Sequence, residues 1–294
     1  MAAKAAEESK ELAKVQSAEL TEDVLAELAE DAGAGTSSSA DDNVIPFLSL
    51  LQDLSPEAKS RDPEYVDGAK PGMILNKANK RIYSVEKSPA DGGDTLEFQH
   101  CAFQRRVVEW VPRDLGGGFV AHHDPRPGET IDQLLERIGK KVVDPKDTKG
   151  TKFIWKSKEN PDNELRDTRY HYGNIIDADG SLFPAVLSFS SSGHTGSREW
   201  MTLMNNFKIN VGGKLVTAPA WSKKYRIRTK LRSNNSGEWF VIYVEDAGII
   251  TDGAIRAAGK ALFEAFSSGA IRADDGDGDS AAAGAGAGGD DIPV

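Results

Sequence analysis

Residues 221–232 contain the densest group of side chains that could bind a polyanion. Six of these twelve residues are basic and none is acidic. Five of the six occupy alternate positions: Lys224, Arg226, Arg228, Lys230 and Arg232. A period of two, with β-branched and aromatic residues between the charges, predicts a β-strand whose alternate side chains point to opposite faces. One face would therefore carry five cations in a row, and the other would pack against a core.

This row of cations has two interpretations. Like charges repel one another, so a polyanionic ligand explains a row of one sign better than solubility does. The alternative is a solvated edge strand, because lysines on an edge prevent pairing with other chains. The sequence leaves both interpretations open.

Further basic residues lie close in sequence to aromatic ones. Unpaired bases stack on aromatic rings, and each such contact contributes about 1–3 kcal/mol to binding. Arg198 also follows a Ser/Gly-rich stretch that predicts a helix start, where free amides can bind phosphate. Beyond the alternating cations, the candidate nucleic-acid-binding residues are Lys152, Trp155, Lys156, Arg169, Tyr172, Arg198, Trp200, Trp221 and Trp239. Core packing is the alternative for each aromatic residue, and a solvated surface is the alternative for each cation.

Motifs for catalysis and metal binding are missing or incomplete in the sequence. The chain has neither a Gly-x-x-x-x-Gly-Lys-Ser/Thr phosphate loop nor a Gly-x-Ser-x-Gly nucleophile motif. His122 and His123 are adjacent, and adjacent side chains of an extended strand point apart. Asp177 starts a sequence like a calcium loop, but Ser188 stands at the twelfth position, where an acid is needed. We therefore predict no catalytic residues, no metal site and no cofactor.

The net charge of −10 is unevenly distributed along the chain. Residues 1–43 hold 3 basic and 11 acidic residues, and residues 270–294 hold 1 and 6. The middle, residues 44–269, holds 32 basic and 29 acidic residues. A weakly basic middle between two acidic ends indicates contact with nucleic acid, combined with acidic tails.

The cysteine content and hydropathy predict a cytoplasmic protein without membrane contact. Cys101 is the single cysteine, which excludes an internal disulfide framework and fits a reducing compartment. No stretch approaches the roughly 18 apolar residues of a membrane span. Residues 1–8 lack the apolar region of a signal peptide.

The predicted elements are mainly strands. Alternating patterns predict long strands at about 95–111, 221–232 and 238–245, the last two joined by a Ser-Asn-Asn-Ser-Gly turn. Helical spacing of apolar residues predicts helices at 130–138, 197–207 and 251–266. The order lacks a strand–helix alternation, which favours an α+β or mainly β fold over a doubly wound sheet. An OB-type antiparallel barrel with insertions and flanking helices is the simplest fit.

Composition divides the chain into three parts. Residues 1–43 are predicted to form an acidic helical arm and a flexible linker. Residues 44–269 would form the nucleic-acid-binding core. Residues 270–294 would be a disordered acidic tail, because Asp, Gly, Ala and Ser cannot bury apolar area.

The end of this tail resembles a known recognition element. After the Gly-rich stretch the chain ends with Asp290, Asp291, Ile292, Pro293 and Val294. This resembles the acidic tip of bacterial single-stranded DNA-binding proteins, which ends in two acids, Ile, Pro and a hydrophobic residue. The resemblance implies that the tip docks into basic-rimmed apolar pockets of replication, recombination or repair proteins. Val294 replaces the usual terminal Phe of that family, a difference that bears on affinity for such pockets.

Residues 45–72 and 187–200 are similar to bacteriophage single-stranded DNA-binding proteins. The resemblance implies a protein that binds and protects single-stranded DNA in the host cytoplasm, with little sequence preference, during phage replication and recombination. It is compatible with a homo-oligomer. Two other classes stay open: a virion structural or assembly protein, and a nuclease or recombination enzyme with acids scattered in sequence.

Overall fold

The structure is a computed structural model that describes residues 44–234 and 237–273. The predicted helical arm and linker (1–43) lie outside the described residues. The same holds for the tail beyond residue 273, including the tip at 290–294.

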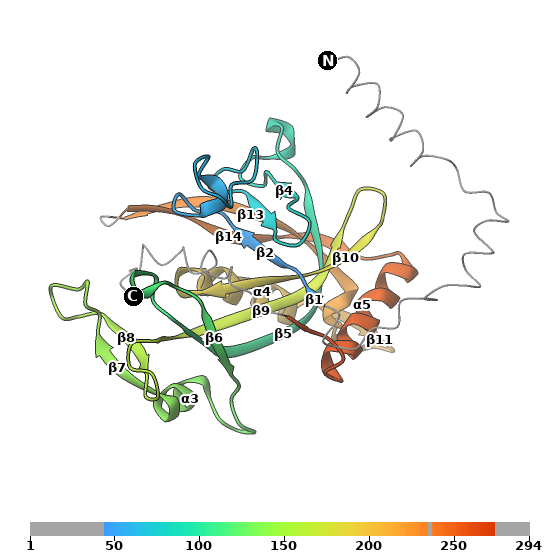
Figure 1. The fold of residues 1–294 in the computed structure, drawn as a ribbon. Helices are drawn as coiled ribbons and strands as arrows, with labels where there is room; N and C mark the ends of the chain where they lie inside the picture. Colours follow the sequence, from blue (N-terminus) through green and yellow to red (C-terminus); the bar gives the residue numbers. More distant parts are fainter. Residues whose placement is uncertain (1–43, 235–236, 274–294) are drawn as a thin grey trace, which may run out of the picture. The chain divides into compact units, whose positions relative to one another are not determined.

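Most of the described chain forms one curled β-sheet of eleven strands (Figure 1). Its main path runs β14–β13–β5–β9–β10–β2–β3–β4, while β6 pairs with β5, and β8 joins β7 to β9. Every pair in this sheet is antiparallel except that of β10 with β2. The strands are β2 (Phe47–Leu50), β3 (Ile74–Asn76), β4 (Ile82–Tyr83), β5 (Leu96–Trp110), β6 (Phe119–His123), β7 (Gly139–Val143), β8 (Phe153–Ser157), β9 (Glu164–Ile176), β10 (Leu182–Ser190), β13 (Lys223–Asn234) and β14 (Gly237–Ile249).

Helices and two small strand pairs complete the described part. The α-helices are α3 (Ile131–Ile138), α4 (His194–Asn206) and α5 (Gly253–Ser267). The small pairs are β11 (Lys208–Val211) with β12 (Lys214–Thr217), and β1 (Val44–Ile45) with β15 (Arg272–Ala273). The mainly β class is confirmed, as are the predicted long strands and helices, whose ends shift by a few residues. None of the helices in this part of the chain is long and apolar enough to span a membrane.

The narrower prediction of an OB-type barrel is not confirmed. Within the described residues, the end strands β14 and β4 do not pair with each other. Instead, the side-chain amide of Gln52 exchanges two hydrogen bonds with the backbone of Phe240 in β14, both at 2.9 Å. The Thr229 hydroxyl of β13 also donates to the Gly72 carbonyl oxygen at 2.5 Å. Side chains rather than a strand ladder therefore hold the two ends of the curled sheet together.

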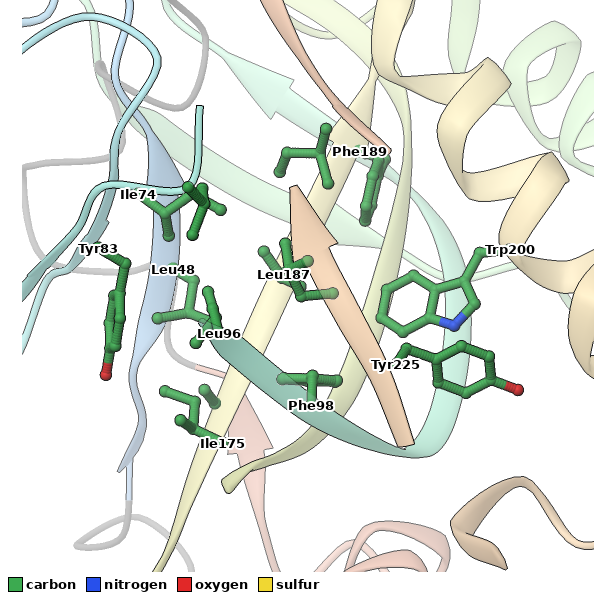
Figure 2. Close-up of a cluster of buried hydrophobic side chains, with 14 of the residues drawn as sticks. Leu48, Ile74, Tyr83, Leu96, Phe98, Ile175, Leu187, Phe189, Trp200 and Tyr225 are labelled. Atoms are coloured by element: carbon green, nitrogen blue, oxygen red, sulfur yellow. The ribbon is translucent and has the colours of Figure 1, made fainter. Parts of the chain in front are cut away.

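The main core fills the inner face of the curl. Figure 2 shows side chains from both ends of the sheet converging there, with Trp200 of α4 beside Tyr225 of β13. The centroids of these two rings are 5.6 Å apart. Trp200 is also stacked on His171 of β9, with centroids 4.4 Å apart and planes 4° from parallel. Helix α4 is therefore fixed to the sheet by its aromatic anchor.

Helix α5 covers the other face. Its Phe266 contacts Tyr172 of β9, with ring centroids 4.4 Å apart. The buried Gln99 side chain of β5 donates to the Ile255 carbonyl oxygen of α5 at 2.9 Å and accepts from Asn174 at 3.0 Å. Gly259 makes this close approach possible, because a Cβ there would lie 2.3 Å from the Gln99 amide nitrogen.

Two buried imidazoles connect β5, β9 and α4. His100 Nε2 lies 3.0 Å from His171 Nδ1, and His171 Nε2 lies 2.8 Å from the Ser197 hydroxyl of α4. Burial lowers the pKa of His100 to about 3. Burial, followed by the nearby His100 and Arg169, holds the pKa of His171 well below its usual value. Both imidazoles are therefore neutral in the folded protein near pH 7.

This burial predicts a loss of stability in mild acid. The imidazoles of the unfolded chain take up protons below about pH 6.5, whereas the folded protein resists protonation. The free energy of unfolding should therefore fall as the pH drops from about 6.5 towards 5, by up to about 1.4 kcal/mol per pH unit for each imidazole. Urea unfolding between pH 7 and 5 measures this slope, which should be shallower in a His100→Gln variant. An unfolding free energy that stays constant over this range would contradict the prediction.

Candidate nucleic-acid interface

A groove of about 690 Å³ lies between strands β8 and β9 and the start of α4. Its lining combines cations, carboxylates, aromatic rings and hydroxyl groups from segments that are far apart in sequence. The lining includes Lys141, Lys152, Phe153, Trp155, Asp167 and Arg198. Three of the predicted binding residues, Lys152, Trp155 and Arg198, thus meet in one groove.

The hairpin of β7 and β8 supplies the aromatic wall. Phe153 is 52% exposed, and the Lys141 ammonium lies 4.9 Å from its ring centroid. Trp155, on the same face of β8 by alternation, is half-buried and packs against the apolar residues around Leu165 and α3. The wall therefore offers one open ring and one ring fixed by packing.

The start of α4 supplies the opposite wall. A short 3-10 turn, Ser191–Gly193, leads into the helix, and its first residue has the left-handed φ of 46°. No side chain caps the helix at Gly193. The His194 amide donates to the Ser191 carbonyl oxygen of this turn, and the dipole at the start of the helix favours an anion nearby. Arg198, exposed in the second turn, adds a cation to this wall.

Three arginines gather beside the groove around one aspartate. Arg105 of β5 and Arg169 of β9 lie directly opposite each other, and Asp167 accepts two hydrogen bonds from Arg105, at 2.8 and 2.6 Å. Burial lowers the pKa of Arg169, and the positive charges of Arg105 and Arg198 lower it further. Within residues 44–234 and 237–273, neither Arg169 nor Arg198 lies in an ion pair. The local charge beside the α4 start is therefore positive.

Other predicted residues do not contribute a free surface to this groove. Lys156 donates to the Asp162 carbonyl oxygen at 2.8 Å and lies 3.6 Å from the Glu164 carboxylate. Trp221 is half-buried, with its ring centroid 4.9 Å from that of Phe263 in α5. Both residues have structural contacts that account for them without a ligand.

Three predicted stacking residues are buried in the structure: Trp239, which is 7% exposed on β14, and the two rings of Trp200 and Tyr172. Trp200 is 0% exposed, between His171 and Tyr225 in the main core. Tyr172 is also buried, under Phe266. Neither of these two rings has a free face for a base, because Trp200 is on the inward face of α4 and Tyr172 is on a part of β9 that is buried on both faces. Helical and strand spacing predicted these elements correctly but not the inward direction of these two rings.

The cations of β13 alternate with the buried residues Tyr225, Ile227 and Thr229, whereas Leu231 near the end of the strand is 51% exposed. Tyr225 and Ile227 belong to the main core, and the cations point to the other face of the strand. On the neighbouring strand β14, Trp239, Val241 and Tyr243 lie directly opposite Arg232, Lys230 and Arg228, so they share the face of the cations.

The two ends of this cation row differ in their partners. Lys224 lies 2.5 Å from Glu97, and Arg226 lies 3.9 Å from Glu97 and 3.8 Å from Glu245. Lys230 lies 4.8 Å from the ring centroid of Tyr243. Glu97 and Glu245 thus neutralise the first two cations, while the excess positive charge lies from Arg228 onward.

The groove and the cation row are on opposite faces of the sheet. Arg226 lies opposite Glu97 of β5, and the adjacent residue Phe98 points into the main core. A bulge at Cys101 shifts the alternation of β5 by one residue, so Arg105 points to the same side as Phe98. The candidate residues of the cation row and those of the groove therefore form two separate surfaces.

Some site residues were not singled out from the sequence. Phe153 lies between Lys152 and Trp155, and strand alternation alone would have placed it on the face of Trp155. The pairing of Arg105 with Asp167 had no local signal, because the two residues are 62 positions apart on different strands.

Comparisons with known proteins give one match. A family model described as Pam3 phage gp34-like protein matches residues 15–272. This range includes both walls of the groove and the whole cation row. No curated protein and no solved structure matches the chain.

Proposed function

The chain belongs to the Pam3 phage gp34-like family, and as the function of this phage protein we propose binding of single-stranded DNA in the groove between β8 and α4. The supporting observation is the pairing of an aromatic wall with a cationic wall. Phe153 offers an open ring, and across the groove stand Arg198 and the uncapped start of α4.

The two walls suit the two chemical parts of a DNA strand. The rings would stack on unpaired bases, and the guanidinium and helix amides would hold phosphates. A duplex hides the faces of its bases, so the open ring favours a single strand. Because every base has a stacking face, the site would have little sequence preference. OB-type proteins also bind oligonucleotides on a curled antiparallel sheet. We propose that the sheet of this protein is related to the OB type.

The acids in the groove bear on the alternative of a nuclease. Asp167 is held by Arg105, and Glu164 accepts from Arg166 at 2.8 Å. A divalent cation would have to displace these arginines, so the groove favours binding over metal-dependent cleavage. Incubating single-stranded DNA with the protein and Mg²⁺ or Mn²⁺ tests this alternative, and cleavage would favour an enzyme.

Charge reversal in the groove tests the proposed function. A Lys152→Glu/Arg198→Glu variant should bind oligo-dT at least about tenfold more weakly at low salt, because two phosphate contacts become repulsive. The plot of log affinity against log salt should also become shallower by about 1.4, or about 0.7 for each lost contact to a single strand. Fluorescence titration at several salt concentrations measures both quantities.

A matched control carries the same charge change elsewhere. Lys208→Glu/Lys214→Glu places it on the exposed β11–β12 hairpin, outside the groove and the cation row, and should retain the wild-type affinity. Equal losses in both variants would mean that only net charge matters. Unchanged binding in the groove variant, or no binding by the wild type, would contradict the proposal and favour a virion structural or assembly role.

The acidic tail is proposed to have two roles. Its tip, Asp290 to Val294, would recruit replication or recombination proteins, and its acids would compete with DNA for the basic groove. Removing residues 274–294 should therefore raise DNA affinity several-fold at low salt, and the gain should shrink as salt screens the charges. A tail of the same length made of Gly and Ser should reproduce the gain. Equal or weaker binding by both variants would exclude the competition.

A further inference from the structure

The cation row of β13 is a second surface with the chemistry of a nucleic-acid contact. Arg228, Lys230 and Arg232 lie on one face, and in the described part of the chain none of the three lies in an ion pair. The rings of Trp239 and Tyr243 share this face. Successive cations are two residues apart on a strand, which places them about 6.7 Å apart.

Unsatisfied buried donors on this face point to an acceptor. Arg228 is only 7% exposed, yet its Nη1 has no hydrogen-bond partner among the described residues. The indole Nε1 of Trp239 is likewise buried without a partner there. A buried donor without an acceptor costs about 1–3 kcal/mol, more when it is charged. Phosphate oxygens would satisfy both donors.

The regular spacing indicates the form of the ligand. A single small anion would be bound by converging side chains, whereas three cations at even intervals along a strand follow an extended polyanion. The half-buried ring of Tyr243 beside them would suit an unpaired base, as the rings of the groove do. The ligand chemistry of the cation row is thus the same as that of the groove.

The sheet separates the two surfaces. One face of β5 and β9 carries Arg105 and Arg169 beside the groove, and the other face continues into the cation row through Glu97 and Arg226. One short strand of DNA therefore cannot lie on both surfaces without passing around the edge of the sheet.

We infer that the cation row binds a second segment of single-stranded DNA, so that one chain holds two segments at once. This inference rests on the proposed function of the groove. A protein with this property brings two strands together, or two distant parts of one strand, and so would assist their annealing or compaction.

Binding of two short labelled oligo-dT molecules tests this inference. One oligomer carries a donor dye and the other an acceptor, and sedimentation of the complex counts chains and oligomers. The wild type should hold two oligomers per chain and show energy transfer between them. Lys230→Glu/Arg232→Glu should hold one oligomer per chain without energy transfer, and Lys208→Glu/Lys214→Glu should still hold two.

The outcomes separate this inference from the proposed function. One oligomer per wild-type chain would overturn the second site and leave the proposed function of the groove intact. A complex of two chains with two oligomers has the same ratio and counts as the same outcome. Two oligomers per chain in Lys230→Glu/Arg232→Glu would overturn it as well. No bound oligomer on the wild type would overturn both proposals. If the charge reversal prevents folding, as circular dichroism would show, Lys230→Gln/Arg232→Gln gives the same test.

Discussion

The alternation of side chains along the paired strands β5 and β9 is the constraint on which the rest of the structure depends. These strands pair over most of their length, with the bulge at Cys101 as the one shift in their register. One set of alternate residues, including His171 and Arg169, faces α4, and the other set, including Tyr172, faces α5. Because each residue faces only one side of the sheet, α4 packs against one surface of this strand pair and α5 against the other.

Packing and electrostatics meet at the start of α4. The stacked pair of Trp200 and His171 and the bond from His171 to Ser197 fix the helix on the core side. The first turn then comes next to Arg169, whose Nη1 lies 3.4 Å from the His194 carbonyl oxygen. Asp167 offsets the guanidinium of Arg105, which reduces the repulsion among the three arginines and leaves an excess of positive charge beside the start of α4. The aromatic core thus positions the cationic wall.

The sequence predicted elements better than it predicted surfaces. The alternation from Lys224 to Arg232 and the turn after it predicted the β13–β14 hairpin and its cation face, because these signals are local. The direction of Trp200 could not be predicted, since helical spacing gives a stripe of residues but not which neighbour covers it. The groove combines β8 with the start of α4, about 40 residues apart in the chain, and the pairing that joins them follows from the sheet order rather than from any local pattern. The same long-range order decides that the cation row and the groove lie on opposite faces.

The central claim is that single-stranded DNA lies in the groove between β8 and α4, and photochemical crosslinking tests it most directly. An oligo-dT carrying photoreactive iodouracil bases would be bound to the full chain, irradiated and mapped by mass spectrometry. The account predicts crosslinks to Phe153 or Trp155 and to the segment 191–198, at an occupancy that falls with salt. Crosslinks confined to other parts of the chain, with none in either wall of the groove, would contradict it.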